Sequence, residues 1–155
     1  MSGESVRAWL ADHAPDLMLI DHSRSTATVI EAADVLGIEP ARIAKTLALK
    51  VGDEVMLLVT RGDARLDNAL CKAQLGGRPR MLDPEATLAA TGHAVGGVCP
   101  FGLSNMLPIV ADTSLLAFET VFPAAGTQTS SVEVEPRRLA ELIGARWVTI
   151  CKLPE

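Results

Sequence analysis

The chain of 155 residues is 48% hydrophobic and 21% charged, and it carries a net charge of −5 at pH 7. These values are typical of one soluble globular domain, the acidic balance argues against broad nucleic-acid binding, and no apolar run is long enough to cross a bilayer. Three separated cysteines without CxxC or Cys/His spacing support neither a disulfide framework nor a zinc site. We therefore expect a single cytoplasmic domain over residues 1–155, without metal, cofactor or membrane contact.

The predicted elements follow one another with short connections. In chain order we expect a helix at 4–13, a strand at 16–21, a helix at 28–37, strands at 46–51 and 54–60, helices at 67–75 and 83–92, strands at 107–112, 116–122 and 130–135, a helix at 136–144 and a strand at 146–151. The helix signals include the capping-box spacing of Thr28 and Glu31, and Gly37 as a stop.

The strongest hairpin signal is the pair Gly52 and Asp53 between the strands at 46–51 and 54–60. Both arms are apolar at nearly every position, which implies a sheet covered on both faces. Many strands mixed with helices predict an α+β, or mixed α/β, domain around one curved sheet.

Lys45 shares the strand alternation of Leu47, Leu49 and Val51. A lysine on an aliphatic face either lies at the strand end and extends its charge to water, or points into a pocket as a fixed cation. The sequence by itself leaves both open.

Residues 91–102, TGHAVGGVCPFG, combine four glycines with a histidine, a cysteine and a proline. Gly96 and Gly97 permit close approach to the backbone, whose N–H groups can bind an anion or a developing oxyanion. The stretch lacks the GxGxxG and GxxxxGK[ST] patterns. The alternative is a tight structural crossover between a helix and a strand.

Other candidates have both a structural and a functional reading. Cys99 as a nucleophile needs an activating histidine, but the spacing to His93 is not diagnostic, so we expect Cys99 in a pocket wall and His93 at a rim. Asp112 holds a ligand amine or caps the next turn, and Gly126 is a hairpin turn or a close backbone approach. Local hydrogen bonding explains Thr26 before its helix.

One local basic patch stands out from the acidic composition. Residues 61–80 contain five basic side chains against two acidic ones: Arg61, Arg65, Lys72, Arg78 and Arg80 against Asp63 and Asp67. The patch fits either a short piece of a polyanion or an ordinary solvated surface.

Six segments in a fixed order give a more specific signal than any one of them. STATVIEAADVLGI, RIAKTLALKV, TRGDARLD, TGHAVGGVCPFG, LPIVAD and AAG together resemble the YbaK/ProX family of aminoacyl-tRNA deacylases. The related module is the editing domain of bacterial prolyl-tRNA synthetases. The resemblance runs from about residue 20 to residue 150.

The resemblance implies a barrel-like, curved mixed sheet surrounded by helices, and a trans-acting hydrolase that cleaves the ester of mischarged tRNA. The expected substrate is prolyl-tRNA carrying alanine or cysteine, and the expected partners are the aminoacyl-tRNA 3′ end and prolyl-tRNA synthetase. Lys45, Gly96 and Gly97 are then catalytic, with Lys45 anchoring a phosphate or polarising the carbonyl and the loop amides facing the oxyanion. The family motifs place Cys99, Pro100, Asp112 and Gly126 among the substrate-binding residues, and we expect Thr26 and His93 to bind the substrate as well.

The sequence departs from the family pattern in three places. Cys99 stands where many relatives carry serine, residues 103–106 replace a basic run, and the chain contains no tyrosine. Two other functions therefore stay open: a non-catalytic module that binds aminoacyl-tRNA ends or a synthetase, and a thiol-dependent acyl hydrolase that uses Cys99.

Overall fold

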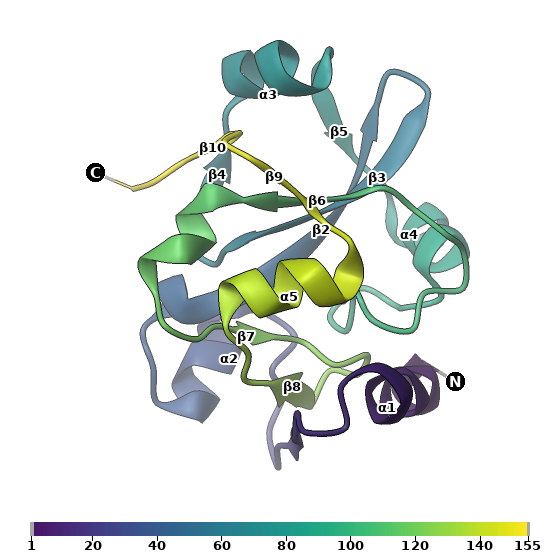
Figure 1. Cartoon of the computed structure of the whole chain (residues 1–155), viewed down its shortest axis with the longest axis vertical. Coiled ribbons are helices and arrows are strands. Elements are labelled where there is room, and N and C mark those ends of the chain that lie inside the picture. Colours follow the sequence, from purple (N-terminus) through teal and green to yellow (C-terminus); the bar gives the residue numbers. More distant parts are fainter. Residues whose placement is uncertain (1, 155) are drawn as a thin grey trace.

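A long β-hairpin lies at the centre of the fold in the computed structural model, which describes residues 2–154. Its arms are β2 (Ile43–Val51) and β3 (Glu54–Arg61), which pair antiparallel with Val51 opposite Glu54 (Figure 1). Gly52 in the turn has a φ of 62°, a left-handed value that glycine adopts without strain. The hairpin predicted from the sequence is therefore confirmed.

The main sheet has the strand order β5-β2-β3-β6-β9, and β7 pairs with β2 as well. The added strands are β5 (Pro79–Met81), β6 (Ile109–Asp112), β7 (Phe122–Pro123) and β9 (Arg146–Val148). The pairs β2–β7, β3–β6 and β6–β9 are parallel, and the others are antiparallel. Two short antiparallel pairs complete the strands: β1 (Leu19–Asp21) with β8 (Ser130–Val132), and β4 (Arg65–Leu66) with β10 (Cys151–Lys152).

Three of the helices begin at capping residues that the sequence indicated. The helices are α1 (Ser2–His13), α2 (Val29–Leu36), α3 (Asn68–Leu75), α4 (Pro84–Thr91) and α5 (Pro136–Ile143), with 3₁₀ turns η1 (Pro40–Arg42) and η2 (Thr113–Ala117). The side chains of Thr28, Asp67 and Asp83 each accept a hydrogen bond from a first-turn N–H group. Within residues 2–154, no helix is long and apolar enough to span a membrane.

The two edges of the main sheet do not meet, so the barrel-like closure expected from the sequence is not confirmed. Among the described residues, β5 and β9 are the terminal strands of the path, and β10 pairs with β4 instead of extending β9. The break after β9 has a local cause, because the N–H groups of Ile150 and Cys151 donate to the Asp112 carboxylate, at 2.8 and 3.1 Å.

Two predicted strands are also corrected. The strand expected at 116–122 is instead η2 followed by the two residues of β7, because the Asp112 side chain accepts a bond from the Ser114 N–H and turns the chain after β6. The strand expected at 146–151 is divided between β9 and β10. In both cases the chain changes direction where backbone N–H groups bind the Asp112 carboxylate.

Both faces of the sheet are covered, as the apolar hairpin predicted. Leu57 and Val59 on β3 belong to a cluster with Val6 of α1 and Leu139 of α5, whereas Leu58 belongs to a second cluster on the opposite face. Alternate residues of one strand therefore serve two cores, which explains why the hairpin is apolar on both faces. Figure 1 shows α5 lying across the sheet.

Candidate functional site

The centre of β2 is unpaired along one edge. The partner strand β7 covers Ile43 and Ala44, and β5 covers β2 from Leu49 onward. The Leu82 N–H donates to the Ala48 carbonyl at 3.0 Å, which closes the gap from one end. N–H and C=O directions alternate along a strand, so those of Thr46 point to the same side as the Ala48 carbonyl, toward the open edge.

A cavity of about 460 Å³ lies at this open edge. Most of its wall is aliphatic and comes from β2, α2, β7 and the chain around β5. Its polar wall residues are Thr26, Thr28, Lys45, Thr46, Thr87, Ser130 and Ser131. Gly96 and Val98 of the glycine-rich loop also line it. Lys45 and the loop, more than forty residues apart in the chain, thus face one cavity.

Most wall hydroxyls already have partners inside the protein. Thr26 Oγ1 donates to the Gln128 carbonyl at 3.2 Å, and Ser131 Oγ lies 2.7 Å from His22 Nε2. Thr46 Oγ1 differs, because it is the single buried side-chain oxygen or nitrogen of the described residues that has no partner. A buried polar group without a partner costs about 1–3 kcal/mol, which a ligand that bonds to it recovers.

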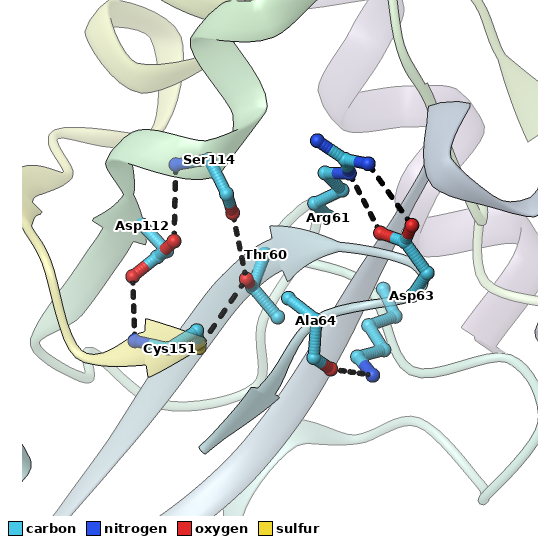
Figure 2. Close-up of polar contacts among 8 residues, drawn as sticks. Thr60, Arg61, Asp63, Ala64, Asp112, Ser114 and Cys151 are labelled. Carbon is cyan, nitrogen blue, oxygen red and sulfur yellow. Dashed lines mark hydrogen bonds and ion pairs between the residues drawn. The ribbon is translucent and has the colours of Figure 1, made fainter. Parts of the chain in front are cut away.

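Lys45 is a half-buried cation without a carboxylate partner in the described chain. Its Nζ donates to the Ala64 carbonyl at 2.6 Å. Asp63 is nearby but pairs with Arg61 through bonds of 2.6 and 3.0 Å, and Figure 2 shows these two side chains pointing toward one another. Burial lowers the pKa of Lys45, partly offset by the charges of Cys151 and Asp63. Lys45 is therefore a half-buried residue of the cavity wall, while its ammonium bonds to the carbonyl of Ala64, which is not one of the wall residues.

The glycine-rich loop packs against the distant Gly126. A Cβ on Gly97 would lie 3.0 Å from backbone atoms of Gly126 and Thr127, and Gly96 has a φ of 96°. The backbones of Gly97 and Gly126, two glycines that the sequence singled out, are thus in close contact. The Gly97 N–H donates to the Ala94 carbonyl at 3.0 Å and is occupied by that bond.

Two other amides of the loop retain their hydrogen-bonding capacity. Within residues 2–154, no acceptor bonds to the N–H groups of Gly96 and Val98, both of which line the cavity. An oxyanion at this loop would therefore meet Gly96 and Val98, whereas the sequence had suggested Gly96 and Gly97.

Cys99 and His93 come together in the buried interior and are not among the residues that line the cavity. Both are 0% exposed, and Cys99 Sγ lies 3.6 Å from His93 Nε2. Nε2 also lies 2.7 Å from the Phe101 carbonyl, an acceptor only, so Nε2 carries the proton and cannot take one from the thiol. Burial raises the pKa of Cys99 to about 12 and lowers the pKa of His93. The rim position expected for His93 and the pocket-wall position expected for Cys99 are wrong.

Asp112 and Pro100 do not line the cavity either. Asp112 is 1% exposed, and its carboxylate accepts bonds from the Ser114 and Cys151 N–H groups, as Figure 2 shows, and from the Ile150 N–H group. These bonds correspond to the capping alternative for Asp112. Pro100 is buried beside Cys99. In residues 2–154, no cluster of three or more His, Cys, Asp or Glu side chains could hold a metal ion.

Of the residues singled out from the sequence, Thr26, Lys45 and Gly96 line the cavity, while Gly97 and Gly126 support its loop. Sequence reasoning missed Thr46 and Ser131. Thr46 follows Lys45 directly, but its importance depends on β2 being unpaired there, and no local pattern announces a gap in pairing.

Comparison with known proteins gives matches over nearly the whole chain. Residues 23–142 match the aminoacyl-tRNA editing domain. The chain is 40% identical over 154 residues to the uncharacterised protein YwhH of Bacillus subtilis, with 98% of each chain covered. It is 34% identical over 113 residues to a proline–tRNA ligase of Desulforamulus reducens, a match that spans 72% of this chain and 20% of the ligase.

Solved structures share the fold. One is described as a proposed trans-editing enzyme for prolyl-tRNA synthetase and superimposes with a TM-score of 0.89, at 31% identity and 97% coverage of both chains. The hypothetical protein APE2540 gives a TM-score of 0.88 at 30% identity, with 96% of this chain and 99% of that chain covered.

The sequence motifs, the mixed α/β fold and these matches lead to one assignment. The domain match covers well over half of the chain, and the YwhH match covers both proteins almost completely. The resemblance to the YbaK/ProX family is therefore confirmed, and the chain belongs to the aminoacyl-tRNA editing domain family of deacylases.

Proposed function

We propose that this deacylase cleaves, in trans, the ester of prolyl-tRNA that carries a small wrong amino acid, alanine or cysteine. The observation that carries the proposal is the cavity at the open edge of β2, where Lys45, Thr46 and Gly96 face one space. Its largely aliphatic wall suits a small apolar side chain, and its size leaves room for the ribose that bears the ester. The enzyme would meet the mischarged tRNA in the cytoplasm, either while the tRNA is still bound to prolyl-tRNA synthetase or after its release.

The chemistry needs few side chains, because an aminoacyl ester is already activated compared with an amide. Water attacks the carbonyl carbon, and the N–H groups of Gly96 and Val98 bind the negative charge that develops on the carbonyl oxygen. The bond from this carbon to the ribose oxygen then breaks, and the ribose leaves as a hydroxyl with the proton that the water gives up. Lys45 supplies the fixed positive charge that binds the terminal phosphate or polarises the carbonyl. Thr46 offers its hydroxyl, N–H and C=O to the amino acid.

Neither Asp112 nor Cys99 is available as a base or nucleophile in this arrangement. The carboxylate of Asp112 is occupied by three backbone N–H groups, and the thiol of Cys99 is protonated and inaccessible. A thiol-dependent hydrolase is disfavoured for the same reason.

The test is a deacylation panel with alanyl-, cysteinyl- and prolyl-tRNA of the proline isoacceptor, and with correctly charged alanyl-tRNA as a control. We expect the wild type to release alanine or cysteine from proline tRNA faster than proline, and Lys45→Ala to lose this activity. Release from none of the substrates would reject the proposal. Binding of charged tRNA without release would support the non-catalytic module instead.

A further inference from the structure

Two exposed cations lie directly opposite each other beside the cavity. Lys50 on β2 pairs in register with Arg80 on β5. Side chains in register on adjacent strands stand on the same face of the sheet, about 4.5–5.5 Å apart at their Cβ atoms. We propose that Lys50 and Arg80 form a clamp for the phosphates of the single-stranded RNA that leads into the cavity; this inference rests on the proposed function.

The strand alternation connects this pair to the cavity. Thr46, Ala48 and Lys50 occupy alternate positions of β2 and share one face, and the first two line the cavity. Leu82, which directly follows β5 and donates its N–H to Ala48, lines the cavity, and Arg80 lies two residues before it. Two residues of strand span about 6.6–6.8 Å, so the cations stand immediately outside the cavity wall.

The fold itself does not explain why two positive charges face each other. Like charges directly opposite in a sheet are destabilising, and both side chains are exposed. In the described chain neither Lys50 nor Arg80 has an ion-pair partner, whereas the surface cations Arg7, Arg24 and Arg138 each pair with an aspartate. A bound polyanion would supply the missing negative charge.

The surroundings of the pair fit a nucleotide. Val95 and Met81 line the cavity and are 53% and 58% exposed although both are apolar, and Met81, which alternates with Arg80, lies on the other face of β5. Exposed apolar side chains in the cavity wall suit a nucleobase, and the two cations suit its phosphate. The chain is acidic as a whole, so this local charge would guide only the end of an RNA. It locates on β5 part of the basic patch that the sequence showed.

The experiment compares Lys50→Gln/Arg80→Gln with a matched double variant, Arg137→Gln/Arg146→Gln. The control residues are exposed cations on α5 and on β9, the opposite edge strand, and they also lack ion pairs in the described residues. Two quantities are measured over a range of KCl concentrations: the kcat and KM for deacylation, and the Kd for an uncharged single-stranded RNA oligonucleotide ending in CCA.

We expect Lys50→Gln/Arg80→Gln to raise KM and Kd about tenfold at low salt, with kcat unchanged. Each single-strand phosphate contact contributes about −0.7 to the slope of log affinity against log salt, so losing two should reduce the slope by about 1.4. Hydrolysis of an aminoacyl-adenosine without phosphates should not change, and the melting temperature should stay the same or rise as the charge repulsion disappears. The control variant should behave as wild type.

Unchanged KM, Kd and salt slope in Lys50→Gln/Arg80→Gln would overturn the clamp while leaving the proposed hydrolysis intact. An equal loss in the control variant would show a nonspecific effect of net charge and overturn it as well. If the wild type hydrolyses nothing, the proposed function fails, but the oligonucleotide titration still decides the clamp. Absence of oligonucleotide binding by the wild type at low salt would reject it.

Discussion

The two sides of the glycine-rich loop differ in their suitability for catalysis. The inner side holds Cys99 and His93, the residue types of a thiol catalyst, but both are fully buried and the thiol has a pKa of about 12. On the outer side, Gly96 and Val98 line a cavity together with Lys45, and their N–H groups have no acceptor in residues 2–154. The comparison teaches that access and unused hydrogen-bonding capacity, more than residue type, distinguish a site from a core.

The largest effect is expected from Lys45→Met, which keeps the volume of the side chain and removes its charge. We expect kcat/KM for the mischarged tRNA to fall about 100-fold, or about 2.7 kcal/mol, because a hydrogen bond to a charged group is lost. Steady-state kinetics on the preferred substrate measures this. Lys72→Met, at an exposed position of α3, is the control and should keep full activity.

The same variant has a pH signature in stability. Burial lowers the pKa of Lys45 in the folded protein below its ordinary 10.5, so the unfolded state binds more protons between the two values. The wild type should therefore gain stability relative to Lys45→Met as pH rises through that window, and the cost of the buried charge should be fully present below it. A constant difference between the two denaturation curves would contradict the burial of this charge.

Gly97→Ala should come next, because its Cβ would press on the Gly126 backbone at 3.0 Å and move the loop. We expect the activity to fall on the order of tenfold, since small displacements of a site are costly, and the free energy of unfolding to fall by about 1–3 kcal/mol. Gly37→Ala, at the left-handed end of α2 with open space around it, is the control: it should lower stability without lowering activity. Equal activities in the two variants would contradict the proposal that the glycine-rich loop positions the reacting ester.

Thr46→Val tests the outer side with a smaller change. The hydroxyl has no partner in the described protein, so we expect stability to stay the same or rise and kcat/KM to fall about fivefold, the value of one neutral hydrogen bond. Thr60→Val is the mirror control, because the Thr60 hydroxyl lies in the network with Ser114 and Cys151 (Figure 2). That variant should lose stability and keep activity. Chemical denaturation and steady-state kinetics on both variants measure these two opposite patterns. Loss of activity in Thr60→Val, or no loss in Thr46→Val, would contradict the proposed role of Thr46.

The smallest effect on activity is expected from Cys99→Ser on the inner side. Activity should stay within about twofold of wild type, and stability should fall by about 1 kcal/mol as a core thiol is replaced by a hydroxyl. Iodoacetamide should leave Cys99 unmodified in the folded protein, as mass spectrometry can show. A loss of activity comparable with that of Lys45→Met would show that Cys99 takes part in catalysis and would contradict the assignment of the site to the cavity.

Local signals explain which parts of the structure the sequence predicted. Thr28, Asp67 and Asp83 cap their helices as their positions indicated, and the turn at Gly52 forms the hairpin. Prediction failed at 116–122, where the Asp112 carboxylate turns the chain into η2. The sequence shows that Asp112 can cap, but not that it would also bind the N–H groups of Ile150 and Cys151 from the end of the chain.

By itself, the sequence determined the α+β class, the covered hairpin, the family and the candidacy of Lys45 and the glycine-rich loop, because these depend on local periodicity and on the order of motifs. Only the tertiary structure decided that β5 and β7 leave the centre of β2 open, that Thr46 has no partner there, and that Cys99 faces the core. The physical reason is that strand pairing and burial are long-range properties. Neither a gap between two strands nor the side of a loop that meets solvent is encoded in neighbouring residues.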